Sequence, residues 1–438
     1  MRLPSWLPVL LLAFSANVNA QAVRSVPTWP AHACGQRAPD ESPRPAYSDA
    51  GVLRSWRAPV DVHVARGLDA PAALAVLADA ERVVDALARL GVGLPLPDGD
   101  RGGTPSFDVY VRPATGTASE GRARAEWLAA GEAWDRATSF GEIAVGSDAF
   151  SRTRAVAQAV AEGCVYAAKA DAPPAFVRSM GAALMHRALD VPLDADDVRA
   201  FQADPAAGWW WDGTRSAAAQ RGGAIVLDAM AERWDEGGAT FLRGLLEAPV
   251  QRTPPGWPLL WDEPDVFDVL KRVTRDEPRG VWGALLFAAS ARSLEGTAGG
   301  TRDVGGVRDG SLVAAPLRSV GWEQLPTWSV ATGIAPTGSA SVEISLLHAP
   351  RTGSVGVWVH ASPYTRWMAS VLRIGADGRL VGTLDSELID TGEWATSVDA
   401  IEDAAKLVVV VVSAGDETLE PDGEPVRDGW VGINVGRR

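Results

Sequence analysis

The segment from Arg154 to Arg187 constrains the fold more than any other part of the sequence. Its first half, RAVAQAVAEGCVYAAKA, is nearly all apolar, and its second half, PPAFVRSMGAALMHRAL, begins with prolines, as helices often do. The two halves predict a pair of packed helices joined by a short Ala-Asp-Ala-Pro-Pro turn. Arg154, Gln158 and Glu162 recur at every fourth position, so they share one face of the first helix. The pattern predicts a buried helix with one polar face.

Length and charge set the broad class of the protein. A chain of 438 residues is long enough for two or more domains, each with its own core. The net charge is −14 and no block of Lys or Arg is present, which argues against nucleic acid and anionic membrane surfaces as partners. The 18 tryptophans most simply fill cores and helix–sheet seams, although some could form a platform that binds sugar or peptide.

The N-terminus has the pattern of a signal peptide. Arg2 supplies the positive region, Trp6 to Phe14 supply the apolar region, and small residues predict cleavage after Ala20. We therefore expect a secreted or periplasmic protein, and no later apolar run reaches transmembrane length. In an oxidising compartment, Cys34 and Cys164 could form a disulfide that ties the N-terminal tail to the central helix. Alternatively, they are separate thiols and Cys164 is a small core residue.

The sequence predicts an α+β fold in two domains. Residues 1–20 are the signal peptide, and residues 21–55, rich in Pro, Ala and Ser, form an extended segment. Residues 56–295 form a mainly helical domain with a small N-terminal layer of strands and helix. A glycine-rich flexible linker, 296–310, leads to residues 311–438, where short alternating segments with Asp-Gly turns predict an all-β sandwich.

Five elements are expected before the central helix pair. Alternation of apolar and polar residues predicts strands near 60–64 and 107–111, and a third strand at 141–146. An Asp-Ala-Pro-Ala start and a closing glycine predict a helix over 69–90. The Ala-rich and Arg-rich segment 120–136 predicts another helix.

The order and spacing of these elements resemble the gluzincin branch of the H-E-x-x-H zinc peptidases. Such a site needs two His one helical turn apart, a Glu beside the first His, and a third ligand from the next helix. Here strands and a helix lead to a helix with polar positions four residues apart. A Pro-Pro turn, a second helix, the segment QRGGAIVLDAMAERWDEGGATFLRGLL and a β-sandwich follow. The resemblance covers residues 56–438 and is one of pattern, because no diagnostic motif is intact.

The resemblance implies that the zinc site has been lost. Gln158 stands at the first His, Ala159 at the catalytic Glu, and Glu162 at the second His. Ser179 stands at the third ligand, with Met180 as the alternative register. Gln, Glu and Ser form a poor zinc set, and an alanine cannot activate water. We therefore expect no cofactor.

The resemblance also implies a catalytically inactive metallopeptidase-like protein with a binding or scaffolding role. Its partner would be a peptide, a protein or a cell-envelope component. Three adjacent tryptophans, Trp209, Trp210 and Trp211, would form part of the cleft rim or seal a seam between domains.

Three alternatives remain open from the sequence. The protein could be an active secreted zinc-dependent peptidase or another hydrolase, with a site rebuilt around Glu162. It could be an adhesive or structural envelope protein that works through the β-sandwich. Finally, Gln158 and Glu162 could simply be the solvated stripe of an amphipathic helix, with Glu162 paired to Arg154 or Lys169.

Overall fold

The computed structural model describes residues 44–47, 51–99, 101–128, 136–169, 172–209, 215–235, 239–246, 266–277, 279–294, 312–350, 352–399, 401–415 and 428–438. The predicted signal peptide and linker lie outside these ranges, as do Cys34, Trp210 and Trp211. Within the ranges, no helix has the length and apolar character needed to cross a membrane.

A five-stranded mixed sheet frames the first part of the molecule, in the order β1-β2-β3-β5-β4. The strands β2, β3 and β5 run parallel, and antiparallel strands lie at both edges. Their bounds are β1 Val52–Arg54, β2 Val60–Val64, β3 Phe107–Pro113, β4 Glu120–Leu128 and β5 Ala137–Val145. The helix α3 (Ala70–Arg89) connects β2 to β3, and Asp69 caps it by accepting a hydrogen bond from the Ala72 N–H, as the sequence predicted.

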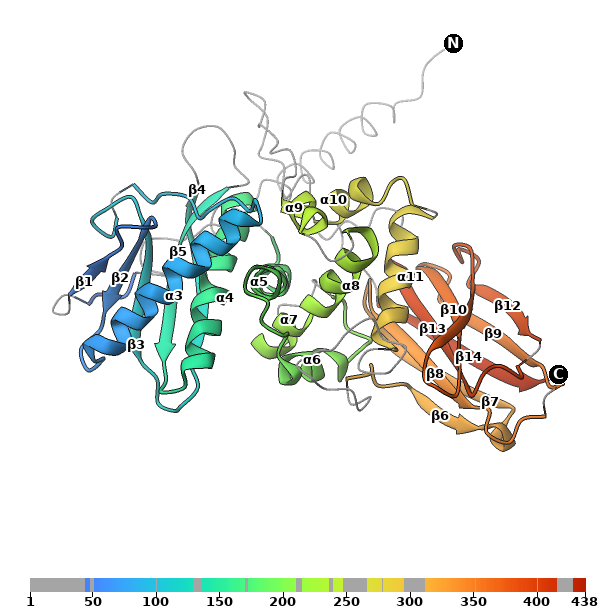
Figure 1. Cartoon of the computed structure of the whole chain (residues 1–438). Helices are drawn as coiled ribbons and strands as arrows, with labels where there is room; N and C mark the ends of the chain where they lie inside the picture. Colours follow the sequence, from blue (N-terminus) through green and yellow to red (C-terminus); the bar gives the residue numbers. More distant parts are fainter. Residues whose placement is uncertain are drawn as a thin grey trace, which may run out of the picture.

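The predicted central helix pair is confirmed as α4 (Ala149–Ala168) and α5 (Pro174–Leu189). Figure 1 shows α4 between the sheet and α5, and this position explains why its residues from 155 to 165 are all buried. Six shorter helices continue toward the C-terminal part: α6 Ala195–Gln202, α7 Ala217–Gly222, α8 Ala224–Asp235, α9 Thr240–Leu246, α10 Val266–Val273 and α11 Gly280–Arg292.

The prediction of a mainly helical, zinc-peptidase-like first domain is wrong. A sheet of five strands, not a small layer, carries the helices, and it recruits β1 from the segment predicted as an extended tail. The segment predicted as a helix over 120–136 begins instead with strand β4. Its Ala and Arg residues favour helix locally, but Arg122 and Arg124 alternate with Ala123 and Ala125. That two-residue period suits a strand whose one face packs on α4.

Two further sheets pack face to face in the C-terminal part, as the alternating segments predicted. Their strand orders are β11-β10-β13-β8-β6 and β12-β9-β14-β7. The bounds are β6 Arg318–Gly321, β7 Thr327–Ile334, β8 Ser339–Ser345, β9 Val355–Ala361, β10 Arg366–Ile374, β11 Leu380–Asp385, β12 Glu393–Val398, β13 Lys406–Gly415 and β14 Gly429–Arg437. A continuous apolar cluster fills the space between the sheets.

The strand β13 is buried on both faces, which accounts for its uninterrupted run of valines. Alternate residues such as Val409 and Val411 belong to the cluster between the two sheets. Val408, Val410 and Val412 belong instead to the core that includes the helices, because α11 packs on this face of the sheet (Figure 1). The sandwich and the helical part therefore share a hydrophobic core.

Candidate functional site

The polar stripe of α4 is buried and hydrogen-bonded. Glu162 is only 2% exposed; its Oε1 accepts from Gln158 Nε2 at 2.8 Å, and its Oε2 accepts from the backbone N–H of Ala123 at 2.7 Å. Gln158 Nε2 also donates to the carbonyl of Arg178 on α5, at 3.1 Å. Because Ala123 lies on β4, Glu162 ties the edge strand of the sheet to the central helix.

The alternative in which Gln158 and Glu162 form a solvated stripe is wrong, because both side chains are buried. Arg154 does not pair with Glu162; its guanidinium lies 3.3 Å from a carboxylate oxygen of Asp194. Burial raises the pKa of Glu162, and the hydrogen bonds from Gln158 and from the backbone of β4 counter only part of that effect.

A close approach of α5 closes this polar cluster. A Cβ atom on Gly181 would lie 2.8 Å from Gln158 Nε2 and 2.9 Å from Glu162 Cγ, so only glycine allows α5 to pack at this distance. The cluster therefore lies where β4, α4 and α5 meet, and its geometry is that of a structural tie; Gln158 and Glu162 each also line one of two neighbouring hollows.

The four positions assigned to the lost zinc site do not all converge. Gln158 and Glu162 meet, but Ala159 lies against β5, where a Cβ on Gly141 would be 3.4 Å from that of Ala159. The Ser179 hydroxyl donates to the carbonyl of Gln220 on α7 at 2.6 Å. In the part of the chain that the structure describes, no three His, Cys, Asp or Glu side chains gather as a metal-binding group. The loss of an ancestral zinc site stays a prediction.

Two adjoining hollows, of about 350 and 650 Å³, run beside β4 and share Glu120, Gly121 and Arg221 in their linings. Arg221 is held by both carboxylate oxygens of Asp197, at 2.8 Å each.

The outer edge of β4 is the place where an extended peptide would pair with the sheet through backbone hydrogen bonds. At the middle of that edge the Ala123 N–H already donates to Glu162, so peptide pairing there would have to break the tie.

Trp209 and Cys164 occupy structural positions. Trp209 is fully buried, and its backbone N–H donates to Thr337 Oγ1 in the sandwich at 2.8 Å. It therefore seals the interdomain seam, which was the alternative to a place on the cleft rim. Cys164 is buried, and as a thiol its pKa is raised by burial to about 12. The predicted disulfide to Cys34 stays a prediction, because Cys34 lies outside the described residues.

The outer face of the four-stranded sheet exposes aromatic side chains that the sequence patterns did not single out. Trp328 on β7 is 47% exposed and Trp430 on β14 is 37% exposed. The benzene ring of Trp328 lies over the backbone of Gly432, where a Cβ atom would come within 2.5 Å of two ring carbons. One side of this indole thus rests on the sheet while the other is open to solvent.

The strand register defines what surrounds Trp328. One row across β7, β14 and β9 contains Val330, Gly432 and His360, and the His360 ring lies 5.8 Å from that of Trp328. The next row places Asn434 between Trp328 and Trp358. We call Trp328, Val330, His360, Trp430 and Asn434 the aromatic face.

Glycines inside the predicted strands could have indicated where this face lies. Glycine weakens a strand interior, and often marks a place where another group approaches the backbone closely. Gly432 underlies Trp328, and Gly356 underlies Trp358, whose ring would come within 2.4 Å of an added Cβ. The guanidinium of Arg438 lies over the ring of Trp358 at 5.3 Å, so Trp328 offers the more open indole.

Comparisons with known proteins do not assign the chain to a family. No protein-family model matches it, and no curated protein does. Among solved structures, it is similar to the pre-peptidase C-terminal domain of a collagenase from Bacillus anthracis (10% identity, 28% of this chain and 96% of that one, TM-score 0.18). It is also similar to CorA, a surface-associated copper-binding protein of Methylomicrobium album BG8 (11% identity, 27% and 97% covered, TM-score 0.18). A third is TmCBM61 in complex with beta-1,4-galactotriose (16% identity, 26% and 67% covered, TM-score 0.16). These TM-scores are too low to support a statement about fold or function.

Proposed function

We propose that this protein is a binding protein that holds a neutral carbohydrate chain on the aromatic face of its sandwich. The observation that carries the proposal is the exposed indole of Trp328, which rests on Gly432 and is flanked by Val330 and His360. Exposed aromatic patches on soluble domains are typical of interaction sites, because leaving them in water is unfavourable.

A sugar ring is complementary to this surface. A pyranose presents a flat face of C–H groups that can stack on an indole, while its hydroxyls reach outward to polar side chains. Asn434, half-buried in the row beside Trp328, offers an amide donor and acceptor to such hydroxyls. His360 lies 3.6 Å from Glu393, and so brings a further polar pair to the edge of the face.

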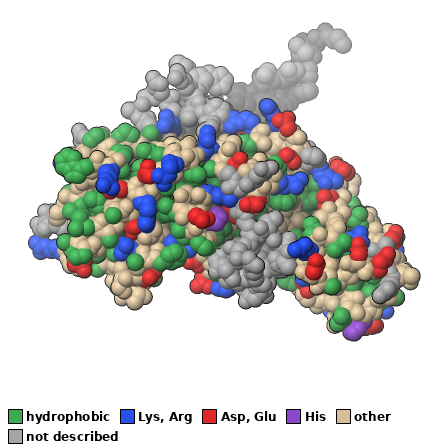
Figure 2. Space-filling model, in the orientation of Figure 1, with side chains coloured by type: hydrophobic (Ala, Val, Ile, Leu, Met, Phe, Trp, Pro, Cys, Tyr) green, Lys and Arg blue, Asp and Glu red, His purple; other side chains and the backbone are tan. Residues whose placement is uncertain are grey.

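The charge distribution favours a neutral ligand. Figure 2 shows Lys and Arg side chains interspersed with Asp and Glu over the visible face of the molecule, without a broad field of one sign. Since a nucleic acid needs a continuous basic surface, neutral polysaccharides are the class to test.

The test uses purified full-length protein and insoluble neutral polysaccharides, namely cellulose and chitin. We expect retention on at least one of them, and soluble oligosaccharides of that polymer should compete. Trp328→Ala should weaken binding about ten- to a hundred-fold, because truncating an aromatic side chain at the centre of a binding site typically costs about 1–3 kcal/mol. Gly432→Val keeps the indole but lifts it from the sheet, and should weaken binding as well.

Trp56→Ala is the matched control. Trp56 is 99% exposed but belongs to the connection between β1 and β2, so its removal should leave retention unchanged. If no polysaccharide retains the wild-type protein, or if Trp328→Ala is retained as well as wild type, the proposal is wrong.

A further inference from the structure

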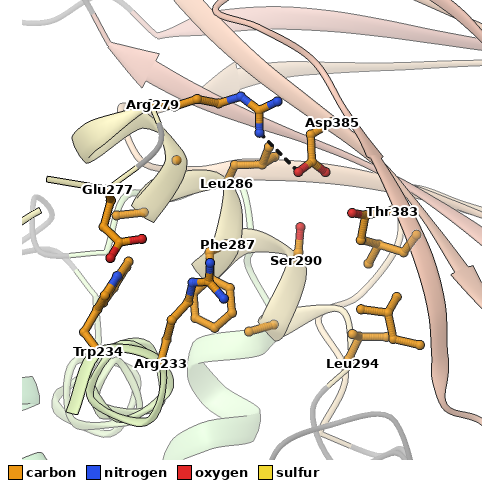
Figure 3. Close-up of a pocket in the computed structure, with 15 residues that line it drawn as sticks. Arg233, Trp234, Glu277, Arg279, Leu286, Phe287, Ser290, Leu294, Thr383 and Asp385 are labelled. Atoms are coloured by element: carbon orange, nitrogen blue, oxygen red, sulfur yellow. Dashed lines mark hydrogen bonds and ion pairs between the residues drawn. The ribbon is translucent and has the colours of Figure 1, made fainter. Parts of the chain in front are cut away.

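A cavity of about 390 Å³ lies between the helical part and the sandwich, on the side of the sandwich opposite the aromatic face. Its walls come from α8, α11 and the strands β10 and β11 (Figure 3). Leu286, Phe287, Leu294 and Leu372 make much of its surface apolar. Its volume falls within the range that small-molecule sites occupy.

One side of the cavity is closed by ion pairs that satisfy their own charges. Arg279, at the start of α11, lies 3.3 Å from Asp385 at the end of β11 and 3.5 Å from Glu387. Figure 3 shows the pair with Asp385 spanning the upper side of the cavity. These ion pairs join the start of α11 to the end of β11 and to the residues just after it.

Three polar side chains, two of them on α8, gather at one side of the cavity. The guanidinium of Arg233 lies 5.1 Å over the Phe287 ring, and no carboxylate of the described residues pairs with it. The Nε1 of Trp234 is buried, and finds no hydrogen-bond acceptor among the described residues. The Glu277 carboxylate lines the same side (Figure 3), and no described cation pairs with it.

We propose that this cavity binds a free α-amino acid with a large apolar side chain. Its carboxylate would accept hydrogen bonds from Arg233, and its ammonium group would donate to Glu277. Its side chain would lie on Phe287 and the leucines. A fatty acid could pair with Arg233 but offers no cation to Glu277, and a hydrocarbon would make use of neither side chain.

Isothermal titration of the purified full-length protein tests each part of this assignment. L-Phenylalanine and L-leucine should bind saturably, with one site per chain. Three comparators should bind at least ten-fold more weakly: N-acetyl-L-phenylalanine lacks the ammonium group, L-phenylalaninamide lacks the carboxylate, and glycine lacks the apolar side chain.

Variants then connect the binding to the named residues. Arg233→Gln should weaken phenylalanine binding about ten- to a hundred-fold, and Glu277→Gln should remove the preference for phenylalanine over its N-acetyl form. Arg57→Gln, at an exposed position between β1 and β2, should bind as wild type does. Thermal melts of all three variants would show that they are folded.

The proposal fails if neither amino acid gives saturable binding. It also fails if N-acetyl-L-phenylalanine binds wild type as tightly as phenylalanine does, because Glu277 would then have no role in recognition. Equal binding by Arg233→Gln and wild type would likewise overturn it.

Discussion

Glu162 is a carboxyl group whose role depends on residues far from it in sequence. Its place on the helix face next to Gln158 follows from the four-residue spacing. The identity of its second partner, the N–H of Ala123, does not, because that contact spans 39 positions and requires β4 to be a strand. Sequence reasoning therefore found the pair but assigned it to a metal site or to solvent.

Glu162→Gln should make unfolding less dependent on pH. Burial raises the pKa of Glu162 in the folded protein above its ordinary value of 4.5. Below that value both the folded and the unfolded chains hold the proton, so the contribution of Glu162 to stability is fully present. As pH rises, the unfolded chain loses its proton first, and that contribution is lost progressively toward the folded pKa.

Urea unfolding of wild type and Glu162→Gln from pH 4 to pH 8 measures this effect. Relative to wild type, the free energy of unfolding of the variant should increase as the pH rises over that range, so that the variant becomes the more stable of the two or closes the gap to wild type. The readout is the trend with pH, because a glutamine also changes the hydrogen bond to Gln158. A difference that stays constant from pH 4 to pH 8 would contradict the assignment.

At the scale of elements, the correctly predicted helices and strands are the ones whose local sequence pattern agrees with their tertiary environment. The helices α3, α4 and α5 have capping or proline starts and long apolar runs, and the valine run of β13 has no plausible alternative to a buried strand. The strand β4 was missed because alanine and arginine favour helix in isolation. Pairing with β5 and packing on α4 override that preference.

Gly121→Ala should test how closely β4 approaches α4. A Cβ at Gly121 would lie 2.0 Å from the carbonyl oxygen of Ala155, a backbone atom that cannot move without displacing the helix. We expect a loss of about 1–3 kcal/mol in the free energy of unfolding, measured by urea denaturation. Gly116→Ala is the control, because a Cβ there meets nothing within 4 Å. Equal stability of the two variants would show that β4 can shift away from α4 to accommodate the added methyl group.

At the scale of the whole molecule, the candidate sites lie where distant segments meet. Trp328 and Gly432 are more than 100 residues apart in sequence, and their contact depends on β7 pairing with β14. The cavity at Arg233 likewise exists only because α11 packs on the sandwich. Composition could indicate that some tryptophans form a platform, but it could not say which ones, since the outward face of each strand follows from sheet pairing.

The shared core predicts that the sandwich and the helical part unfold together. Val410 lies on the face of β13 that packs toward α11 and is 1% exposed. Val410→Ala should therefore lower the unfolding midpoint seen by circular dichroism at 222 nm, which reports the helices, and by tryptophan fluorescence, by the same amount. The expected loss is about 1–3 kcal/mol, from lost apolar contact and a small cavity.

Val330→Ala, on the half-exposed aromatic face of the same sandwich, is the control and should change stability by less than about 0.5 kcal/mol. Two separate transitions, with only the fluorescence midpoint moved by Val410→Ala, would mean that the sandwich is an independent unit and that the contact with α11 contributes little to its stability.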